Sequence, residues 1–282
     1  MISCQACGQL SSPGAAVHAL RAPSRALDPG AGFVTKGRMS RRRTRSRSSR
    51  PRRGGVLNAL ANALRWLRRW LLRLVSVAFL FSVFWVVLYI AINPPGGLYM
   101  LQEYRRIGSI ERQWVPMGAI APVMARSVVA AEDANFCTHW GFDMGEIRRV
   151  IDQGGTRGAS TISQQVVKNV YLWHGRDWTR KVLEAGFTLL VEALWSKRRI
   201  LEVYLNVAEF DDGVFGVEAA ARHYFGVTAR ELSALQAARL AAVIPAPKAR
   251  DAARPSDFVR RRASAIMDGA ATIERDGRAD CF

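Results

Sequence analysis

Acidic residues are scarce in this 282-residue chain, which has 23 Asp and Glu against 41 Lys and Arg. The shortage is concentrated at the amino-terminal end. Residues 1–73 hold sixteen Lys or Arg and a single acid, a net charge of +15, whereas residues 74–282 hold twenty-five and twenty-two, a net charge of +3. The excess of positive charge therefore belongs to an N-terminal arm, and the rest of the chain is close to electrically balanced.

Charge is absent altogether from the segment Leu74 to Ile92, which reads LVSVAFLFSVFWVVLYIAI. A helix of that length is about 28 Å long, enough to cross the hydrocarbon core of a bilayer. Arginines precede the segment and Asn93-Pro94-Pro95 follows it. The positive-inside rule then places the arm in the cytoplasm and the chain after the prolines outside. A cleaved signal peptide is the alternative, but no A-x-A-like site follows, and we expect an uncleaved anchor.

Residues 1–38 show no apolar periodicity, and the run SRRRTRSRSSRPRRGG that follows has two interpretations. One is a contact with nucleic acid, and the other is a disordered arm that fixes topology and touches anionic lipid. We favour the second, because a membrane segment follows, and expect no nucleic acid as a partner. Met39 opens the run and is an alternative start of the chain. The predicted organisation is a basic, largely disordered cytoplasmic arm over 1–73, a transmembrane helix over 74–92 and one domain over 93–282.

Cysteine and histidine are also scarce, with four of each. Cys4 and Cys7 form a lone C-x-x-C without the second pair that a zinc site needs. Cys137 and Cys281 are far apart in the sequence, and nothing in the spacing predicts that they pair. We assign no function to any of the four and expect no metal site built from His and Cys.

Strand-like segments are few in the domain, and helical spacing of apolar residues prevails. Pro122 is suited to the first turn of one helix. Ser160 is suited to the N-cap of another, in which Ile162, Val166 and Val170 repeat every fourth residue and predict one buried stripe. The fold class is therefore mainly α.

Three polar stretches have the composition of a reactive site. EDANFCTHWGFD sets Glu132 beside Asp133, and neighbours on a helix point about 100° apart, so only one of them can face a given cleft. Residues 157–181 carry five cations and one acid, which suggests a phosphate-bearing ligand. In RKVLE, Arg180 and Glu184 form either a simple i,i+4 pair or a carboxylate held among cations in the same cleft. An acid pair in a solvated turn and a solvated basic face are the structural alternatives for the first two stretches.

These stretches, followed by KRRILEVYLN, occur in the order and at the separations of a known family. From about Trp114 to about Pro247, and weakly to Met267, the chain resembles the peptidoglycan glycosyltransferases of glycosyltransferase family 51. FDDGVFGVEAAARHYFG and the short chain are similar to its monofunctional biosynthetic members in Gram-negative bacteria. Ser163 departs from the commoner threonine. Bifunctional relatives add a transpeptidase domain, but S-x-x-K is absent here, and we expect no transpeptidase activity.

The resemblance implies a lysozyme-like glycosyltransferase domain with a smaller membrane-proximal lobe, preceded by one transmembrane helix. It also implies lipid II as the substrate, a disaccharide-pentapeptide on undecaprenyl pyrophosphate. An acceptor sugar hydroxyl attacks the anomeric carbon of the growing chain with inversion, and the lipid pyrophosphate leaves. The implied setting is the bacterial inner membrane with the domain in the periplasm. The implied partners are the growing glycan strand, membrane lipid and proteins of cell-wall synthesis or division.

The family's site residues carry over position by position. Glu132 matches the catalytic general base, and Glu184 the second essential carboxylate. Lys168, Arg180 and Lys181, with Arg176, match the phosphate-contacting positions. The other matching substrate-binding positions are Asp133, Phe136, His139, Gly141, Arg157, Gly158, Ser160, Thr161, Gln164, Gln165 and Asn169. We expect Phe136 and His139 to shape the loop rather than react. No cofactor is expected to be required, and a divalent cation at the pyrophosphate is left open.

Two other functions compete with this interpretation. A cell-wall hydrolase also uses two carboxylates, but cleavage inside a glycan releases no pyrophosphate and gives the cations nothing to bind. A membrane-tethered scaffold driven by the arginine-rich arm would depend on residues 1–73, whereas a transferase would not.

Overall fold

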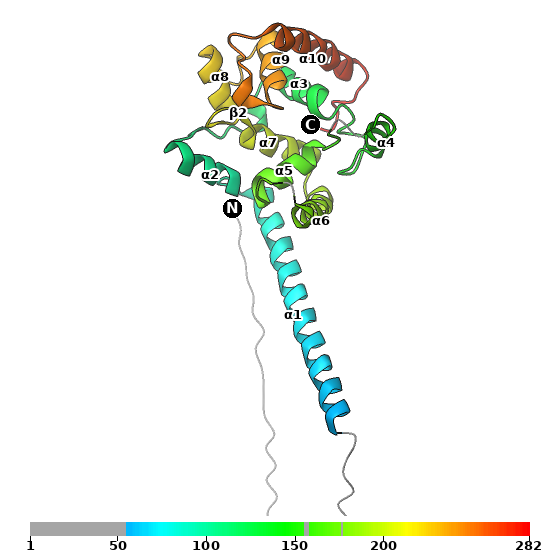
Figure 1. Cartoon of the computed structure of the whole chain (residues 1–282). Helices are drawn as coiled ribbons and strands as arrows, with labels where there is room; N and C mark the ends of the chain where they lie inside the picture. The colour runs from blue at the N-terminus through cyan, green and yellow to red at the C-terminus, as the bar shows by residue number, and fades with distance from the viewer. Residues whose placement is uncertain (1–54, 155–157, 176) are drawn as a thin grey trace, which may run out of the picture. The chain divides into compact units, whose positions relative to one another are not determined.

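The computed structural model describes residues 55–154, 158–175 and 177–282 (Figure 1). Within them the chain is mainly helical, as the sequence predicts. The helices are α1 (Gly55–Ala91), α2 (Leu98–Ile107), α3 (Pro122–Glu132), α4 (Met144–Asp152), α5 (Ile162–Tyr171), α6 (Trp178–Leu194), α7 (Lys197–Val207), α8 (Val217–Phe225), α9 (Ala234–Val243) and α10 (Asp257–Arg275). Short 3₁₀ turns lie at η1 (Met117–Ala119) and η2 (Pro247–Ala249), and the strands are β1 (Glu111–Arg112), β2 (Glu209–Asp211) and β3 (Val214–Phe215).

Helix α1 contains the predicted membrane segment but starts nineteen residues before it, at Gly55. Residues 57–91 have a mean hydropathy of 2.5 in their most apolar window, and α1 is the one described helix long and apolar enough to cross a membrane. The prediction of a disordered arm is therefore wrong for residues 55–73, where Leu, Ala and Trp recur at helical spacing between the arginines. The rest of the arm, residues 1–54, lies outside the described residues.

The last turns of α1 are part of the domain's packing. Val86 and Tyr89 are buried in the hydrophobic core, and the indole N–H of Trp195 donates to the Val86 carbonyl at 2.9 Å. The guanidinium of Arg199 donates to the carbonyls of Tyr89 (3.0 Å) and Ile92 (3.1 Å). Carbonyls at a helix C-terminus have no partner within the helix, so these bonds satisfy them and fix the anchor to α7.

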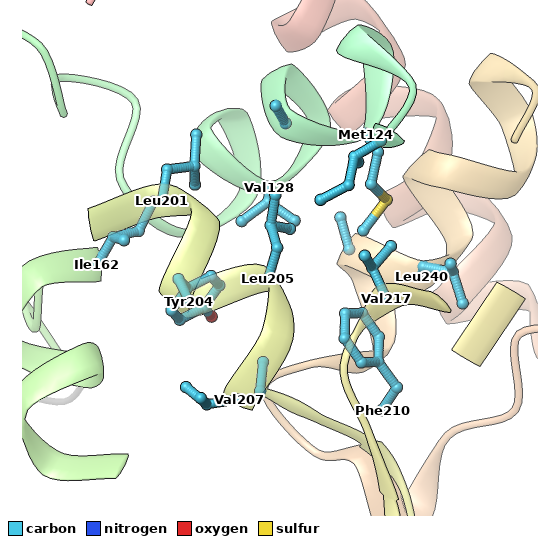
Figure 2. Packing of buried hydrophobic residues seen from close by; sticks show 14 of the residues in the cluster. Met124, Val128, Ile162, Leu201, Tyr204, Leu205, Val207, Phe210, Val217 and Leu240 are labelled. Carbon is cyan, nitrogen blue, oxygen red and sulfur yellow. The ribbon is translucent and has the colours of Figure 1, made fainter. Parts of the chain in front are cut away.

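The core of the domain is built around α7, whose inward residues are fully buried. Figure 2 shows side chains of α3, α5, α7 and α9 converging there, among them Val128, Ile162, Leu205 and Leu240. Helices α3, α9 and α10 pack on one another, and α5 packs against α2, α6 and α7. The second group also contacts the end of α1 and is the membrane-proximal lobe. Its helix α6 exposes a stripe of large apolar side chains, with Trp178 at 86% and Val182 at 67% exposure.

The strands form one small sheet in the order β1-β3-β2. β1 pairs in parallel with β3, and β2 pairs antiparallel with β3 through a short turn at Gly213, whose φ is +77°. The sheet links the segment before α3 to the segment after α7, which sets where α3 enters the core.

Helix starts agree with the sequence prediction at α3 and differ at α5. Pro122 occupies the first turn of α3. The N-cap of α5 is Thr161, not Ser160. Its hydroxyl accepts from the N–H of Gln164, and the side-chain Oε1 of Gln164 accepts from the N–H of Thr161. Both hydroxyl residues suit a cap, and a third contact decides between them, because Thr161 Oγ1 also donates to the Gly141 carbonyl at 2.7 Å.

Cysteine usage is a second correction. Cys137 and Cys281, to which we assigned no function from the sequence, form a disulfide with Cα atoms 5.6 Å apart. The bond joins the loop after α3 to the segment that follows α10, across 144 residues of sequence. Figure 1 shows the C-terminus returning to this loop.

Asn206 provides a test of how the sheet segment is held to α7. The side chain is fully buried, accepts from the N–H of Val115 at 2.9 Å and donates to the Val115 and Glu202 carbonyls at 2.9 and 2.8 Å. Asn206→Ala strands these backbone groups, so we expect unfolding of the detergent-solubilised protein to become easier by about 2–4 kcal/mol. Gln102→Ala on the exposed face of α2 is the control and should change stability by about 0.5 kcal/mol or less. Equal stability of the two variants contradicts the assignment.

Candidate active site

Glu132 is the last residue of α3 and reaches a cavity of about 760 Å³. The amide Nε2 of Gln165, on α5, donates to Glu132 Oε2 at 2.9 Å. The cavity also exposes Ser160 and two arginines, Arg250 and Arg262. Of the acid pair singled out in the sequence, this is the member placed to exchange a proton with a ligand.

Asp133 has a structural role instead, and its carboxylate holds the turn after α3 in place. One of its carboxylate oxygens accepts from the N–H of Ile162 at the start of α5 (3.0 Å), and the other lies 2.8 Å from Nε2 of His139. Asp143 likewise caps α4, accepting from the N–H of Glu146 at 2.8 Å and from Asn135 Nδ2 at 2.9 Å. The acid pair is therefore not a pair in a solvated turn. The Glu132 carboxylate reaches a cavity, whereas the Asp133 carboxylate makes structural hydrogen bonds.

A second cavity, of about 460 Å³, holds the positive charge. We call it the cation cavity; its lining residues are Ser160, Gln164, Gln165, Lys168, His174, Gly175, Arg180, Lys181 and Glu184. Lys168 comes from α5, while Arg180, Lys181 and Glu184 come from the first turns of α6. The basic stretch thus gathers on a concave surface rather than on a solvated face.

Glu184 anchors that charge. Its side chain is 3% exposed and bonds both Arg180 Nη1, at 2.5 Å, and the ammonium of Lys181. Arg180 is held at a second point, donating from Nε to the Gly175 carbonyl at 2.9 Å. The i,i+4 pair predicted from the sequence exists, and it also stands among cations in the cleft, so the two interpretations describe the same arrangement. One carboxylate against three cations leaves an excess of two positive charges among Lys168, Arg180 and Lys181.

Ser160 and Gln165 line both cavities, so Glu132 and the cations open onto one groove. Gln165 and Lys168 also line a third cavity, of about 210 Å³, together with Tyr99, Asn169 and Tyr204. The groove therefore runs from the end of α3 across α5 to the start of α6. A ligand lying in it can touch the carboxylate and the cations at once.

Burial opposes charge at both ends of this groove. Burial raises the pKa of Glu132 above its usual range, and the Gln165 bond with Arg262, Lys168 and Arg250 only partly offsets this. Burial likewise lowers the pKa of Lys168, while Glu184 and Glu132 both pull it back up. Lys168 therefore lies within the fields of the two carboxylates and links them electrostatically.

Sequence reasoning missed the support behind Gln165. The phenol of Tyr204, fully buried on α7, donates to Gln165 Oε1 at 3.1 Å. Because that oxygen is taken, the amide must present its N–H₂ to Glu132, which fixes its orientation. Burial raises the pKa of Tyr204 well above the ordinary value, so the phenol keeps its proton and remains a donor. Tyr204 lies in the KRRILEVYLN stretch, and its burial on the helical stripe was the available signal.

Three further groove residues were not assigned from the sequence. Arg250 and Arg262 lie beyond Pro247, where the family resemblance weakens, and only the packing of α10 on α3 brings Arg262 within 3.4 Å of the Ala131 carbonyl. His174 was taken as structural, and its ring stacks on Tyr99 with centroids 3.7 Å apart. Burial, and after it the nearby Lys168, lowers the pKa of His174 to about 4, so the ring is neutral at pH 7.

Other predicted site residues lie behind the groove surface. Phe136 is fully buried, with the Lys197 ammonium 4.5 Å from its ring centroid. His139 bonds Asp133, and Gly141, at φ +80°, lies so close to Thr188 that a β-carbon there would be 2.8 Å from its methyl group. These residues shape the loop, as expected for the two aromatic rings. Gly158, Thr161 and Asn169 do line cavities; Arg157 and Arg176 lie outside the described residues.

Among the described residues, one cluster of three carboxylates has the geometry of a metal site: Glu103, Glu209 and Asp212. The Lys248 ammonium already lies among them, 2.7 Å from Glu103 and 3.3 Å from Asp212. Positive charge is thus supplied by the chain itself at this cluster.

Comparison with known proteins agrees with this geometry. A family model described as "Transglycosylase" matches residues 100–271, which include every residue named in the groove except Tyr99. The chain belongs to the transglycosylase family. Three relatives, each named "Biosynthetic peptidoglycan transglycosylase", show how close the match is. The protein of Jannaschia sp. (strain CCS1) is 61% identical over 216 residues, covering 77% of this chain and 90% of the relative.

The other two relatives are more divergent. The protein of Rhodospirillum centenum is 47% identical over 216 residues, covering 75% of this chain and 91% of its own length. The protein of Caulobacter vibrioides is 43% identical over 221 residues, covering 77% and 96%. The family resemblance inferred from the sequence is therefore confirmed, and in this transglycosylase it spans the helices from α3 to α9 that form the groove.

Glu132 should limit the stability of the transglycosylase domain. Its raised pKa means that folding disfavours the ionised carboxylate. The free energy of unfolding therefore falls as pH rises above the pKa of Glu132 in the unfolded state, and the loss is complete above its pKa in the folded state. Glutamine keeps the oxygen that accepts from Gln165 and removes the charge. We expect Glu132→Gln to raise the free energy of unfolding at pH 7 by about 0.5–2 kcal/mol, with the gain vanishing below about pH 4. Thermal unfolding at several pH values measures this, and a gain independent of pH contradicts it.

Proposed function

We propose that the protein is a peptidoglycan glycosyltransferase that polymerises lipid II into glycan strands with inversion and release of undecaprenyl pyrophosphate. The observation that carries the proposal is the single groove in which a half-buried carboxylate, Glu132, faces a set of cations anchored by Glu184. The transfer needs both features: a base for the attacking hydroxyl and positive charge for the departing pyrophosphate.

Glu132 acts as the general base in this proposal. A sugar hydroxyl placed in the Glu132 cavity loses its proton to the carboxylate as it attacks the anomeric carbon of the growing chain. A raised pKa makes Glu132 a stronger proton acceptor than an exposed glutamate, which is the direction a base needs. Gln165 and Tyr204 hold the carboxylate in place without sharing its proton chemistry.

The cation cavity receives the leaving group. Lys168, Arg180 and Lys181 present positive charge before the reaction, so little reorganisation is needed as charge gathers on the pyrophosphate. Glu184 keeps Arg180 and Lys181 at fixed positions, and we assign it this supporting role. These side chains supply the charge themselves, so we propose that no cofactor is required; a divalent cation between the pyrophosphate and Glu184 is the alternative arrangement.

The anchor and the disulfide support a setting at the outer face of the inner membrane. α1 is long enough to span a bilayer, with arginines towards its N-terminal end, which the positive-inside rule places in the cytoplasm. A disulfide between Cys137 and Cys281 is stable in an oxidising compartment such as the periplasm. The apolar stripe of α6 suits contact with the bilayer that carries the substrate's lipid tail. Growing strands, membrane lipid and cell-wall synthesis or division proteins are the partners we propose.

Hydrolysis of glycan is the competing activity. A hydrolase needs its second carboxylate to act as base or nucleophile at the sugar. Glu184 is instead 3% exposed and neutralised by Arg180 and Lys181. This favours transfer from a pyrophosphate donor over cleavage, and no S-x-x-K occurs to support transpeptidation.

Replacing the base tests the chemistry directly. With purified full-length protein and labelled lipid II, Glu132→Gln should lower polymer formation by about a thousandfold or more while the protein stays folded. In the wild type, kcat/KM should fall as pH drops through a value above that of an ordinary glutamate, because only the carboxylate form accepts the proton. Polymer on gels from the glutamine variant, or an acidic limb at the ordinary value, refutes the assignment of Glu132.

Replacing Lys168 tests the leaving-group site. Lys168→Ala should lower kcat/KM for lipid II by about a hundredfold, because a half-buried cation facing the pyrophosphate is lost. Lys168→Arg keeps the charge and should recover part of the activity. Arg254→Ala removes an equal charge from a residue 91% exposed and outside the groove, and is the matched control. Equal activity of the two alanine variants removes the phosphate argument.

A further inference from the structure

The loop after α3, residues 133–143, is held at both ends by its own acids. Asp133 ties its start to α5, and Asp143 ties its end to α4. Residues 134–140 of the loop have no hydrogen bond to a residue of α5 or α4 among those described; Gly141, near the end of the loop, accepts one from Thr161, the N-cap of α5. There the segment after α10, Asp276–Phe282, lies against it.

Three contacts join this C-terminal segment to the middle of the loop. The disulfide bonds Cys281 to Cys137. Arg278 Nη1 donates to the Ala134 carbonyl at 3.1 Å, two residues beyond Glu132. The ring of Phe282 lies 6.3 Å, centroid to centroid, from the buried ring of Phe136.

The same C-terminal region also supports the end of α3. Arg262 of α10 donates to the Ala131 carbonyl, and Gly269 of α10 approaches Ala130 so closely that a β-carbon there would be 3.2 Å from the alanine methyl. Residues on both sides of Glu132 are thus gripped by α10 and the segment that follows it. The disulfide is the one covalent bond among these contacts. The hydrogen bonds, which go to the backbone carbonyls of Ala131 and Ala134, lie at the edge of solvent.

We propose that the segment Asp276–Phe282, locked by the Cys137–Cys281 disulfide, is a positioning clamp that holds the loop and Glu132 in the productive geometry, and that its reduction lowers turnover without unfolding the domain. This rests on the proposed function and adds a redox-sensitive positioning element to that site. The cysteines touch no substrate and are positioning residues. Cys281 and Phe282 pack against the edge of the hydrophobic core, which includes Phe136, so the experiment must separate loop placement from folding.

Opening the clamp requires a dithiol. Its thiolate attacks one sulfur of the Cys137–Cys281 bond and forms a mixed disulfide, and its second thiol displaces the protein sulfur. The products are two protein thiols and a disulfide in the reductant, so atoms and electrons balance. In an oxidising compartment the closed form is the resting one.

The experiment compares full-length wild type with the double variant Cys137→Ser/Cys281→Ser, each with and without dithiothreitol. We expect kcat for lipid II polymerisation to fall about ten- to a hundredfold in the double variant while KM stays near the wild-type value, because the attacking geometry is loosened. Dithiothreitol should reproduce this loss in the wild type and change nothing in the double variant. Cys4→Ser/Cys7→Ser is the matched control and should respond to dithiothreitol as the wild type does.

Two readouts separate positioning from simple loss of stability. Amide hydrogen exchange over residues 134–141 should speed up on reduction, while exchange in α7 stays slow. The acidic limb of kcat/KM should move to lower pH, because a loosened loop lets water reach the Glu132 carboxylate. Arg278→Gln, which removes the bond to Ala134 and keeps the disulfide, should give a smaller loss of kcat than the double serine variant.

Unchanged kcat, pH profile and loop exchange after reduction overturn the clamp, even where the melting temperature falls. If the double variant does not fold, reduction of the folded wild type gives the same comparison. If the oxidised wild type makes no polymer, the proposed function fails instead, and the exchange of residues 134–141 still decides whether the disulfide holds the loop.

Discussion

The carboxylate of Asp133 is the interaction on which the site depends. It joins the residue after α3 to the first N–H of α5, so the end of one helix is fixed against the start of the other. Glu132 points into the groove because its neighbour is held from behind, and Lys168 and Gln165 face it because α5 starts at that point. Without this bond, the carboxylate and the cations would belong to two independent elements of the fold.

The groove is a compromise between burial and charge. A carboxylate withdrawn from water costs stability unless cations compensate it, and here Arg250, Arg262 and Lys168 compensate it only in part. On the other side, Glu184 pairs with two cations but carries only one negative charge, so positive charge remains in excess. Under the proposed function, the hydroxyl and the pyrophosphate of the substrate would relieve this unfavourable electrostatic energy at the two ends of the groove. Strain of this kind, retained in an otherwise well-packed domain, is typical of functional sites.

Local sequence patterns predicted those features that depend on neighbours along the chain. The stripe of Ile162, Val166 and Val170, the pairing of Arg180 with Glu184 and the division of labour between two adjacent acids follow from helix geometry. The cap of α5 was missed by one residue, because the carbonyl that selects Thr161 comes from a loop twenty residues away. The disulfide, and the place of the C-terminal arginines in the groove, could not be predicted from the sequence for the same reason. Their partners are more than a hundred residues distant and meet only through packing.

The bonds from Arg199 to the last carbonyls of α1 bear on how the molecule meets lipid-borne molecules. Because these bonds fix α1 to the core, α1 cannot act as a flexible tether. In the membrane setting proposed above, the groove would then be held at one height and one tilt above the bilayer while the whole protein diffuses laterally. Encounters with a lipid-linked substrate would be a search in two dimensions, in which the same edge of the groove always meets the head group.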